Sequence, residues 1–574
     1  MRRLWRLSSL RRVRSSHVLI RTLSTTNGAN TNAAAVEKPY YVTTPIFYVN
    51  ASPHIGHMYT MVLADSFKRW QTLKGNKALL CTGTDEHGMK IQRAAALEDV
   101  PPRQFCDANA AIFKDLAQRS RIDNDFFVRT TDPDHVEAVK HFWFLLNQKG
   151  FIYESKHEGW YCVSDECFYP ESLIEKTVDP MSGQVRMTSI ETGSVVEWTQ
   201  EKNYHFRMTA LKDRLLQFYE QNPEWVVPAS RMSEVVNWVK NNLEDLSISR
   251  PVDRLSWGIP VPDDPGQTVY VWVDALINYL TKAGFPGWTP GAEHAGGWPA
   301  DVHVIGKDIV RFHCVYWPAL LLALDLPLPK RILSHAHWTL GRKKMSKSTG
   351  NVVNPFFAIE RWGADPMRFF LLHDGGIAYD SDYSNAAIVE RYKKLLQWGT
   401  GNLTSRITRP KSWDVRFMVE TAERLPPLGE KPSLLSEQRQ LLLVLPEAVS
   451  RHMDQLNPAG ALKEIMAVMT QTNKFVTDAE PWNLVKAKDL KLRDEQRLRW
   501  TIYLAAEALR ISGILLQPFI PDKAEEMLDI VGVDRTRRRF EDARVGADFT
   551  YGTPMRDPGK SAYDGLFPPL PVED

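Results

Sequence analysis

The first pattern along the chain is a buried strand followed by an amphipathic helix and a second strand. Residues 40–44 are aromatic or β-branched, which predicts a strand that ends at Pro45. From His54 onward apolar residues recur every three or four positions, which predicts a helix that ends near Gly75. The apolar run 78–81 predicts the second strand. This order is typical of a parallel sheet that binds nucleotides at the carboxyl ends of its strands.

Two histidines lie three positions apart where this helix begins. His54 and His57 could each donate a ring N–H to one anion, and Gly56 between them would allow a ligand or a neighbouring backbone to approach closely. The helix start would also offer backbone N–H groups and the positive end of its dipole to phosphates. The alternative is an ordinary helix start whose two histidines are satisfied within the fold.

The pattern changes to long helices beyond about residue 382. Apolar residues at helical spacing form three sets: Leu434, Leu441, Leu442 and Leu445; Leu462, Ile465, Met466 and Met469; and Leu504, Ala508, Ile511 and Leu515. These sets predict an all-α domain at this end of the chain. We therefore expect an α/β domain of the Rossmann type followed by a helical bundle.

Length and composition are those of a multidomain globular protein. The 574 residues allow about three to five domains, and 43% hydrophobic and 24% charged residues are ordinary values. The longest apolar stretch, Val315–Leu324, contains Pro318 and is shorter than the roughly 18 residues of a membrane span. We expect no membrane association. The five cysteines are an odd number spread over a long chain, which favours free thiols in a reducing compartment.

Residues 1–36 contain seven arginines and no acidic residue. These arginines exceed the net charge of +2, so the rest of the chain is acidic overall. Apolar residues at roughly helical spacing and many Ser and Thr complete the pattern of a mitochondrial presequence. We expect import into the mitochondrial matrix and cleavage between about residues 24 and 37. A disordered basic arm that binds nucleic acid and a wrongly assigned start codon are the alternatives.

A second motif, Lys343 to Asn351, packs three lysines and three hydroxyl side chains into a loop that Gly350 bounds. The ordered pair His54-Ile55-Gly56-His57 and Lys344-Met345-Ser346-Lys347-Ser348 resembles both signature sequences of class I aminoacyl-tRNA synthetases. Attack of an amino-acid carboxylate on the α-phosphate of ATP builds negative charge that fixed positive groups must stabilise. The resemblance therefore implies ATP with Mg²⁺ as a ligand and assigns catalysis to His54, His57, Lys344 and Lys347.

The interval between the two signatures is too short for the large hydrolytic editing domain of the isoleucine, leucine and valine enzymes. Four longer segments are similar to methionyl-tRNA synthetases: Tyr41–Asn50, Thr82–Gly88, Tyr270–Tyr279 and Gly306–His313. Together with the helical region, the resemblance runs from about residue 39 to the C-terminus. It implies methionine as the amino acid and tRNA(Met) as the partner.

The same resemblance assigns the binding residues. Asp85 would accept the methionine ammonium group through charge-assisted hydrogen bonds, its alternative role being a helix or turn cap. The residues expected to enclose the thioether are Ile46, Tyr48, Trp272, Ala275, Leu276, Tyr279, Ile309 and His313. Those expected to bind ATP are His54, Gly56, His57, Gly306, Asp308 and Lys347. Without the family, Trp272 and Tyr279 would be ordinary core residues and His313 a helix histidine.

The segment 151–245 matches the connective insertion of the family, in which many members hold a structural zinc with Cys-x-x-Cys pairs. Here Cys162 and Cys167 have four residues between them and no second cysteine pair follows. His157 and His205 could complete a site, but the spacing fits no common ligand pattern. We expect no metal, and two cysteines that are small buried hydrophobic residues.

Asn402, Arg406 and Trp482 match the residues with which the family reads the CAU anticodon by hydrogen bonding and stacking. A buried Trp482 is the alternative. Because no further domain follows the helical region, we expect a monomer. The expected division of the chain is a presequence (1–36), a catalytic domain in two halves (37–150 and 246–340) around the insertion (151–245), a linking region with the lysine loop (341–384) and an anticodon-binding bundle (385–574).

The leading hypothesis is thus a mitochondrial methionine–tRNA ligase that works through methionyl-adenylate. A catalytically idle relative acting as an RNA-binding or splicing partner is a second hypothesis, and both intact signatures count against it. A small-molecule nucleotidyltransferase is a third, and the tRNA-sized helical extension counts against that one.

Overall fold

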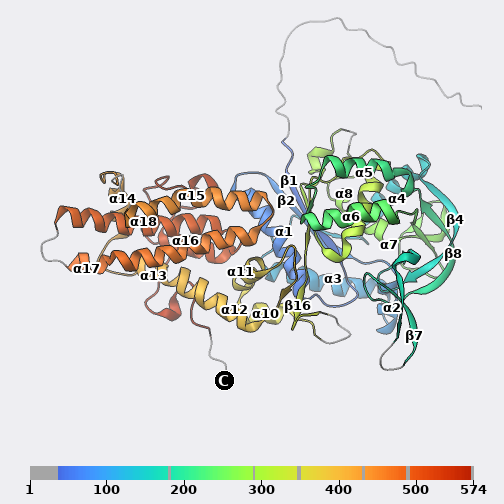
Figure 1. Ribbon diagram of the computed structural model, residues 1–574, viewed down its shortest axis with the longest axis horizontal. Coiled ribbons are helices and arrows are strands. Elements are labelled where there is room, and N and C mark those ends of the chain that lie inside the picture. The colour runs from blue at the N-terminus through green and yellow to red at the C-terminus, as the bar shows by residue number, and fades with distance from the viewer. Residues whose placement is uncertain are drawn as a thin grey trace, which may run out of the picture. The chain divides into compact units, whose positions relative to one another are not determined.

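The computed structural model describes residues 37–178, 183–288, 291–345, 351–428, 433–486 and 491–570 (Figure 1). The expected presequence lies outside these residues. No helix in the described ranges is both long and apolar enough to cross a membrane.

A six-stranded parallel sheet organises the first half of the chain. Its strand order is β3-β2-β1-β14-β15-β9. The strands are β1 (Tyr40–Tyr48), β2 (Ala78–Asp85), β3 (Phe126–Arg129), β9 (Val226–Val227), β14 (Val302–Gly306) and β15 (Ile332–His335). Each neighbouring pair is parallel, so the loops after β1, β2 and β14 meet at one edge of the sheet.

The prediction that the first strand ends at Pro45 was wrong. Strand β1 continues to Tyr48, and its register with β2 shifts between Thr43 and Ile46. Proline lacks the N–H that the ladder needs, but its extended backbone is compatible with a strand, so the chain forms a bulge and continues. After the bulge Tyr48 pairs with Asp85, which brings two expected ligand-binding residues together.

Helix α1 (Ile55–Leu73) follows β1 and is buried along most of its length, in agreement with the predicted helix. The helices between the next strands are α2 (Met89–Leu97), α3 (Pro102–Arg119) and α4 (Pro133–Gln148). Gly75, which has φ 87°, follows the C-cap of α1 and accounts for the predicted end of the helix.

The segment predicted as an insertion, 151–245, contains three of the four strands of an antiparallel sheet, and β10 just beyond it completes that sheet, whereas β9 of the segment joins the parallel sheet. Strands β4 (Ile152–Cys162), β5 (Cys167–Tyr169), β8 (Glu197–Phe206) and β10 (Leu246–Ser247) form it in the order β10-β8-β4-β5. A second hairpin consists of β6 (Ile174–Val178) and β7 (Val185–Ser189), and helices α5 (Lys212–Gln221) and α6 (Ala229–Asn242) follow β8.

The helical region agrees with the predicted periodicities. Its helices are α12 (Asn385–Arg391), the π-helical segment Tyr392–Gly401, α13 (Asn402–Thr408), α14 (Val415–Ala422), α15 (Leu434–Asp454), α16 (Pro458–Ala479), α17 (Pro481–Lys486), α18 (Leu492–Leu516) and α19 (Pro521–Val531). Helices α15, α16 and α18 lie side by side (Figure 1). Their buried stripes include Leu442, Leu462 and Leu504.

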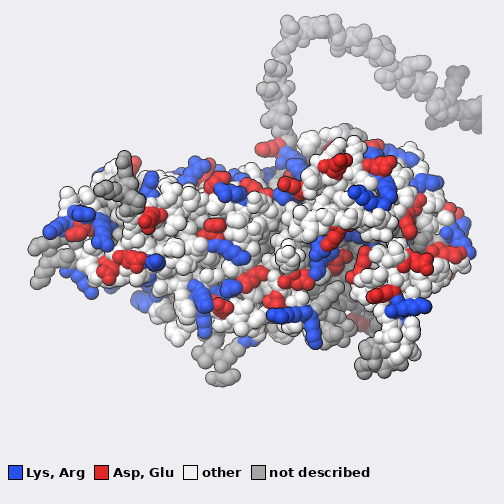
Figure 2. Space-filling model, viewed as in Figure 1, with Lys and Arg blue, Asp and Glu red and all other residues white. Residues whose placement is uncertain are grey.

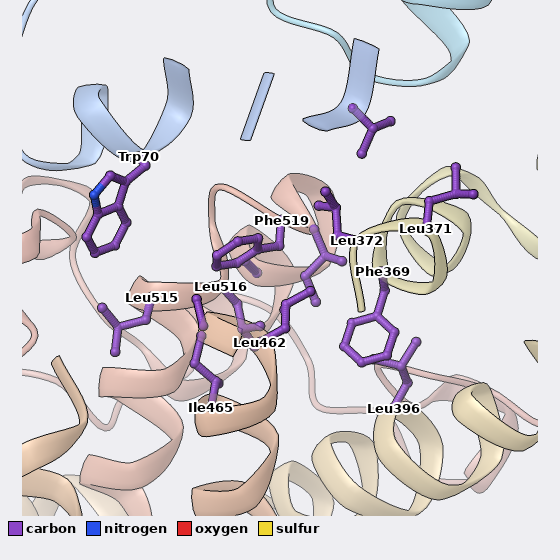
Figure 3. Packing of buried hydrophobic residues seen from close by; sticks show 14 of the residues in the cluster. Trp70, Phe369, Leu371, Leu372, Leu396, Leu462, Ile465, Leu515, Leu516 and Phe519 are labelled. Carbon is purple, nitrogen blue, oxygen red and sulfur yellow. The ribbon is translucent and has the colours of Figure 1, made fainter. Parts of the chain in front are cut away.

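The bundle and the parallel sheet share one hydrophobic core through α1 and α11 (Ala364–Asp374). Figure 3 shows Trp70 of α1 beside Leu515, Leu372 of α11 near Phe519, and Phe369 of α11 beside Leu396. Residues of β1 and α3 belong to the same core. The contact between the bundle and the catalytic domain therefore extends from the bundle helices to the parallel sheet.

A buried ion pair lies at this junction. Arg368 of α11 donates to Asp65 Oδ2 of α1 at 2.6 Å, and both side chains are fully buried. Its other N–H groups donate to the backbone carbonyls of Ser120, Pro518 and Phe519. One guanidinium therefore links the end of α3, the middle of α1 and the end of α18.

Candidate active site

The two histidines at the start of α1 form a reciprocal cap. His54 Nδ1 accepts the backbone N–H of Gly56 at 3.0 Å, and His57 Nδ1 accepts that of His54 at 3.1 Å. The two rings stack with their centroids 3.8 Å apart. Because each Nδ1 is an acceptor, each neutral ring carries its proton on Nε2. Both rings can thus act as N–H donors to an anion.

The expectation that the first backbone N–H groups of α1 bind phosphate needs a correction. The N–H of Ile55 donates to the carbonyl of Val353 at 3.1 Å, and that of Gly56 goes to His54. At least these two backbone groups are therefore used within the fold, whereas the helix dipole still favours an anion at this end of α1. The Nδ1 atom of each histidine is satisfied within the fold, as the alternative interpretation expects.

The contact between Ile55 and Val353 also brings the second motif to the first. Val353 follows the lysine loop, of which residues 346–350, including Lys347, lie outside the described residues. Lys344 ends β17 (Lys343–Lys344), which pairs antiparallel with β16 (Trp338–Leu340). One end of the loop is therefore held by the small sheet of β16 and β17, and the chain beyond the other end is held by the start of α1.

Two glycines make room for side chains of the site. A Cβ on Gly56 would lie 2.8 Å from His54 Cε1, so the glycine accommodates the histidine ring over the helix end. A Cβ on Gly306 would lie 2.6 Å from Asp308 Oδ1. The Asp308 carboxylate, at the carboxyl end of β14, accepts from His337 Nε2 at 3.0 Å.

Asp85 ends β2 and is buried beside Tyr48. Neither Asp85 Oδ1 nor Tyr48 Oη has a hydrogen-bond partner among the described residues. Burial, reinforced by the charges of Asp274 and Glu166, raises the pKa of Asp85 well above its usual value, although the backbone N–H of His87 opposes the shift. The carboxylate has a capping bond, but it also has an unpaired oxygen that suits a cation.

Asp274, to which the sequence assigned no role, is the second buried carboxylate of this region. It accepts from His87 Nδ1 at 2.6 Å and pairs with His135 Nε2 at 2.7 Å. Burial acts to raise its pKa, but the two histidines outweigh that effect and lower it. Asp274 lies within the predicted segment Tyr270–Tyr279, so its position in the sequence was the signal that could have found it.

The residues expected to enclose a thioether are brought together around Trp272. Tyr48 packs edge-on against Trp272 with centroids 6.4 Å apart. Phe312, which the sequence did not assign to the site, stacks on Trp272 at 3.6 Å. Ala275 and Leu276 are buried, and Ile46 and Ile309 pack against the same core. The aromatic rings of Tyr48, Trp272 and Phe312 therefore lie together, and aromatic surroundings suit a polarizable sulfur.

The polar tips of Tyr279 and His313 are bonded to each other. His313 Nδ1 lies 3.0 Å from the carbonyl of Ile309, so it carries the proton and Nε2 accepts from Tyr279 Oη at 2.7 Å. Burial lowers the pKa of His313 to about 4, so the ring is neutral at physiological pH. Buried polar groups that satisfy one another in this way favour an uncharged side chain as their neighbour.

Where many family members have a second cysteine pair, this chain has hydroxyl side chains. Asp165 Oδ2, in the turn after β4, accepts from Thr192 at 2.6 Å, Tyr169 at 2.9 Å and Cys162 at 3.1 Å. Its Oδ1 accepts from Ser194 at 3.3 Å. Within the described ranges there is no group of three or more His, Cys, Asp or Glu arranged to hold a metal. One carboxylate thus links the β4–β5 hairpin to the turn at residues 192–194.

We predict that the purified protein is active without bound zinc and that Cys162→Ser folds normally. Burial and the neighbouring Asp165 raise the pKa of the Cys162 thiol to about 11, so sulfur acts as a weak S–H donor that a hydroxyl can replace. Elemental analysis and a melting curve test this. Stoichiometric zinc that is lost together with folding in Cys162→Ser would contradict it.

The three residues expected to read an anticodon also lie near one another. Arg406 of α13 lies with its guanidinium carbon 5.6 Å from the centroid of the Trp482 ring of α17, and it donates to Thr477 at 3.1 Å. Asn402 is exposed. Trp482 is half-buried, so part of its ring packs against the protein and part faces the solvent. Trp398, to which the sequence assigned no role, is 58% exposed one turn before Asn402 on the same continuous helix.

Comparison with known proteins covers both parts of the chain. The family model described as "tRNA synthetases class I (M)" matches residues 40–408, and the one described as "Anticodon binding domain of methionyl tRNA ligase" matches residues 431–560. A relative from Neurospora crassa, named probable mitochondrial methionine–tRNA ligase, is 62% identical over 96% of this chain and 89% of its own. The human protein named mitochondrial methionine–tRNA ligase is 40% identical over 91% and 88%.

A solved structure is similar over the same range. The Mycobacterium tuberculosis methionyl-tRNA synthetase in complex with methionyl-adenylate has a TM-score of 0.83 and 39% identity, and the match covers 93% of this chain and all of the other.

Proposed function

We propose how the site works from one premise: the chain belongs to the methionine–tRNA ligases, the methionine-specific class I tRNA synthetases. It is accordingly an ATP-dependent ligase that activates methionine as an adenylate and transfers it to tRNA. One observation supports the assignment of these steps to residues: the bond between Ile55 and Val353 joins the first signature to the chain just beyond the second.

His54 and His57 stabilise the charge that develops on the α-phosphate through their Nε2–H groups. Their Nδ1 atoms are fixed by backbone N–H groups, so the donors are oriented before ATP arrives. Lys344 and Lys347 bring positive charge to the departing pyrophosphate from the loop that ends near Val353. Gly306 and Asp308 bind the ribose, and Mg²⁺ enters with ATP.

Asp85 accepts the methionine ammonium group with Oδ1, and Tyr48 Oη lies beside it as a second buried group in need of a partner. The thioether then occupies the pocket around Trp272, whose walls are Ile46, Ala275, Leu276, Tyr279, Ile309 and His313 together with Phe312. Since the polar tips of this pocket are satisfied, a polar side chain in place of the thioether would lose its own hydrogen bonds with water.

The affinity for methionine should rise with pH and then level off. Only ionised Asp85 pairs with the ammonium group, and the pKa of Asp85 is raised in the free enzyme, so binding at a pH below that raised pKa must release a proton. Below it, the affinity should fall up to tenfold for each pH unit. Calorimetry in buffers of different ionisation enthalpy measures the released proton. Affinity that does not change with pH, with no proton release, would contradict the assignment of Asp85.

Recognition of tRNA is assigned to the bundle. Asn402, Arg406 and Trp482 read the CAU anticodon, and exposed Trp398 offers a further stacking surface. Basic and acidic side chains are interspersed over the face seen in Figure 2, which favours recognition by specific side chains over attraction by a uniformly basic surface. We retain the proposed division into catalytic halves 37–150 and 246–340, insertion 151–245, linking region 341–384 and bundle 385–574.

Trp482→Ala should lower charging of tRNA(Met) by one to two orders of magnitude at subsaturating tRNA, because a lost base-stacking surface costs about 1–3 kcal/mol. Pyrophosphate exchange should stay nearly unchanged, since Trp482 would act only on the anticodon. Both activities are measured on one preparation with a melting curve. If both fall together and the melting temperature drops, Trp482 is a structural residue and the anticodon assignment fails.

Both relatives described above are named as mitochondrial enzymes, and the arginine-rich residues 1–36 support the finer proposal that this protein acts in the mitochondrial matrix. We also propose that it acts as a monomer.

Methionine-dependent exchange of pyrophosphate into ATP tests the activation step. The purified enzyme, assayed with each of the twenty amino acids, should exchange label efficiently with methionine alone. Exchange that needs no amino acid would support a small-molecule nucleotidyltransferase, and its absence with every amino acid would support an idle relative.

A further inference from the structure

Glu166 occupies an unusual place in the turn between β4 and β5 of the insertion. It is 1% exposed, and its φ of 56° lies in the left-handed region, which costs free energy for a residue with a side chain. Its Oε2 accepts from Tyr161 Oη at 3.5 Å, and no Lys, Arg or His of the described ranges forms an ion pair with it. A buried carboxylate held in a strained conformation without an ionic partner calls for an explanation.

The first contact of Glu166 is with helix α2 of the catalytic domain. Its Oε1 accepts the backbone N–H of Lys90 at 2.6 Å. The N-cap residue of α2 is Gly88, which makes no side-chain cap bond. The insertion therefore supplies the cap that α2 lacks, and Glu166 is fixed at the positive end of that helix.

Glu166 also lies close to the segment that follows Asp85. The segment that it caps begins three residues after Asp85, and a Cβ on Gly88 would lie 3.1 Å from Glu166 Oε1. Its charge contributes to the raised pKa of Asp85 and of Tyr48, the two residues with unpaired buried polar atoms. Burial raises the pKa of Glu166 itself, whereas the backbone N–H groups of Lys90 and Met89 and the charges of Lys90 and Arg250 favour its ionised form.

We propose that Glu166 is a positioning residue for the amino-acid substrate, through which the insertion adds a second negative charge to the ammonium site. The inference rests on the proposed role of Asp85. Glu166 does not touch the substrate; it fixes the start of α2 and makes the potential around Asp85 more negative, which favours a cation over a neutral group of the same shape. Docking of the β4–β5 hairpin then contributes to the affinity for methionine.

Glu166→Gln removes the charge and keeps an oxygen that can accept the Lys90 N–H. Glu171→Gln, an exposed carboxylate five residues further along, is the matched control. Three ligands are titrated against full-length protein: methionine, methioninol, which keeps the ammonium group, and 4-(methylsulfanyl)butanoate, which lacks it. We expect Glu166→Gln to weaken methionine and methioninol by about three- to tenfold, with the amine-free acid unchanged or tighter. The KM for methionine in pyrophosphate exchange should rise by the same factor with kcat within about twofold.

Equal weakening of all three ligands would show a purely structural cap and overturn the inference, as would three affinities within about twofold of wild type. If Glu166→Gln does not fold, Glu166→Asp is used in its place. This variant withdraws the charge by one methylene, so it should still weaken the affinity for methioninol more than the affinity for the amine-free acid. Equal weakening of the two affinities would overturn the inference. Either failure leaves the proposed function intact if wild type shows methionine-dependent exchange. Loss of that exchange in wild type would refute the proposed function itself.

Discussion

Replacing His57 with alanine should slow formation of methionyl-adenylate by about 10²–10³, the usual effect of losing one preorganised donor to developing charge. The structure gives two reasons. The variant loses the Nε2–H donor of His57, and it also loses the Nδ1 acceptor and the stacked ring that hold His54 in place. Methionine binding should change little, because the thioether pocket and Asp85 are untouched. Lys347→Ala should have an effect of the same size.

Single-turnover kinetics, with methionine affinity measured separately, tests this prediction. His141→Ala, which removes an exposed histidine, is the control. Because His57 is part of the cap of α1, a melting curve must show that the variant is folded. Adenylate formation within about threefold of wild type would mean that His57 does not stabilise the transition state.

Arg368→Met should destabilise the protein by about 3–5 kcal/mol, which is the effect of removing one partner of a buried ion pair. Asp65 keeps its contact with Arg69 but loses the fully buried partner, and the carbonyls of Pro518 and Phe519 lose their donor. Since Asp65 lies on the helix that begins with the histidine cap, we also expect weaker coupling of the bundle to the catalytic site.

Arg69→Met is the matched control for that variant. Arg69 also donates to Asp65 Oδ2, at 2.8 Å, but its side chain is 24% exposed. Its loss should therefore cost no more than about 1 kcal/mol. Denaturant unfolding of the three proteins gives the comparison, and equal stability of Arg368→Met and wild type would show that the buried pair does not hold the junction together.

Periodicity predicted the long helices well, because no competing pattern interrupts their apolar spacing. The helix that begins at His54 and the three buried stripes of the bundle were predicted because each is long and regular. The end of the first strand was predicted wrongly, since proline was treated as a terminator when its neighbours tolerate a bulge. Whether the strand ends or forms a bulge at Pro45 depends on its pairing with β2, which the local sequence does not show.

The resemblance proposed the members of the site but could not predict the hydrogen bonds between them. The resemblance named His313 and Tyr279, but only the structure shows that they bond to each other. Phe312, Glu166 and Trp398 were missed because their roles depend on contacts between segments far apart in the sequence or on exposure at the surface. No periodicity or spacing reports such contacts.

Charging of tRNA(Met) by the full-length enzyme is the decisive measurement, because it needs the catalytic site and the bundle together. The assay combines methionine and ATP with a tRNA that has the CAU anticodon, beside the same tRNA with a changed anticodon. We expect methionyl-tRNA with the first and a rate lower by at least one order of magnitude with the second. Adenylate formation without transfer to either tRNA, or equal charging of both, would contradict the proposed function.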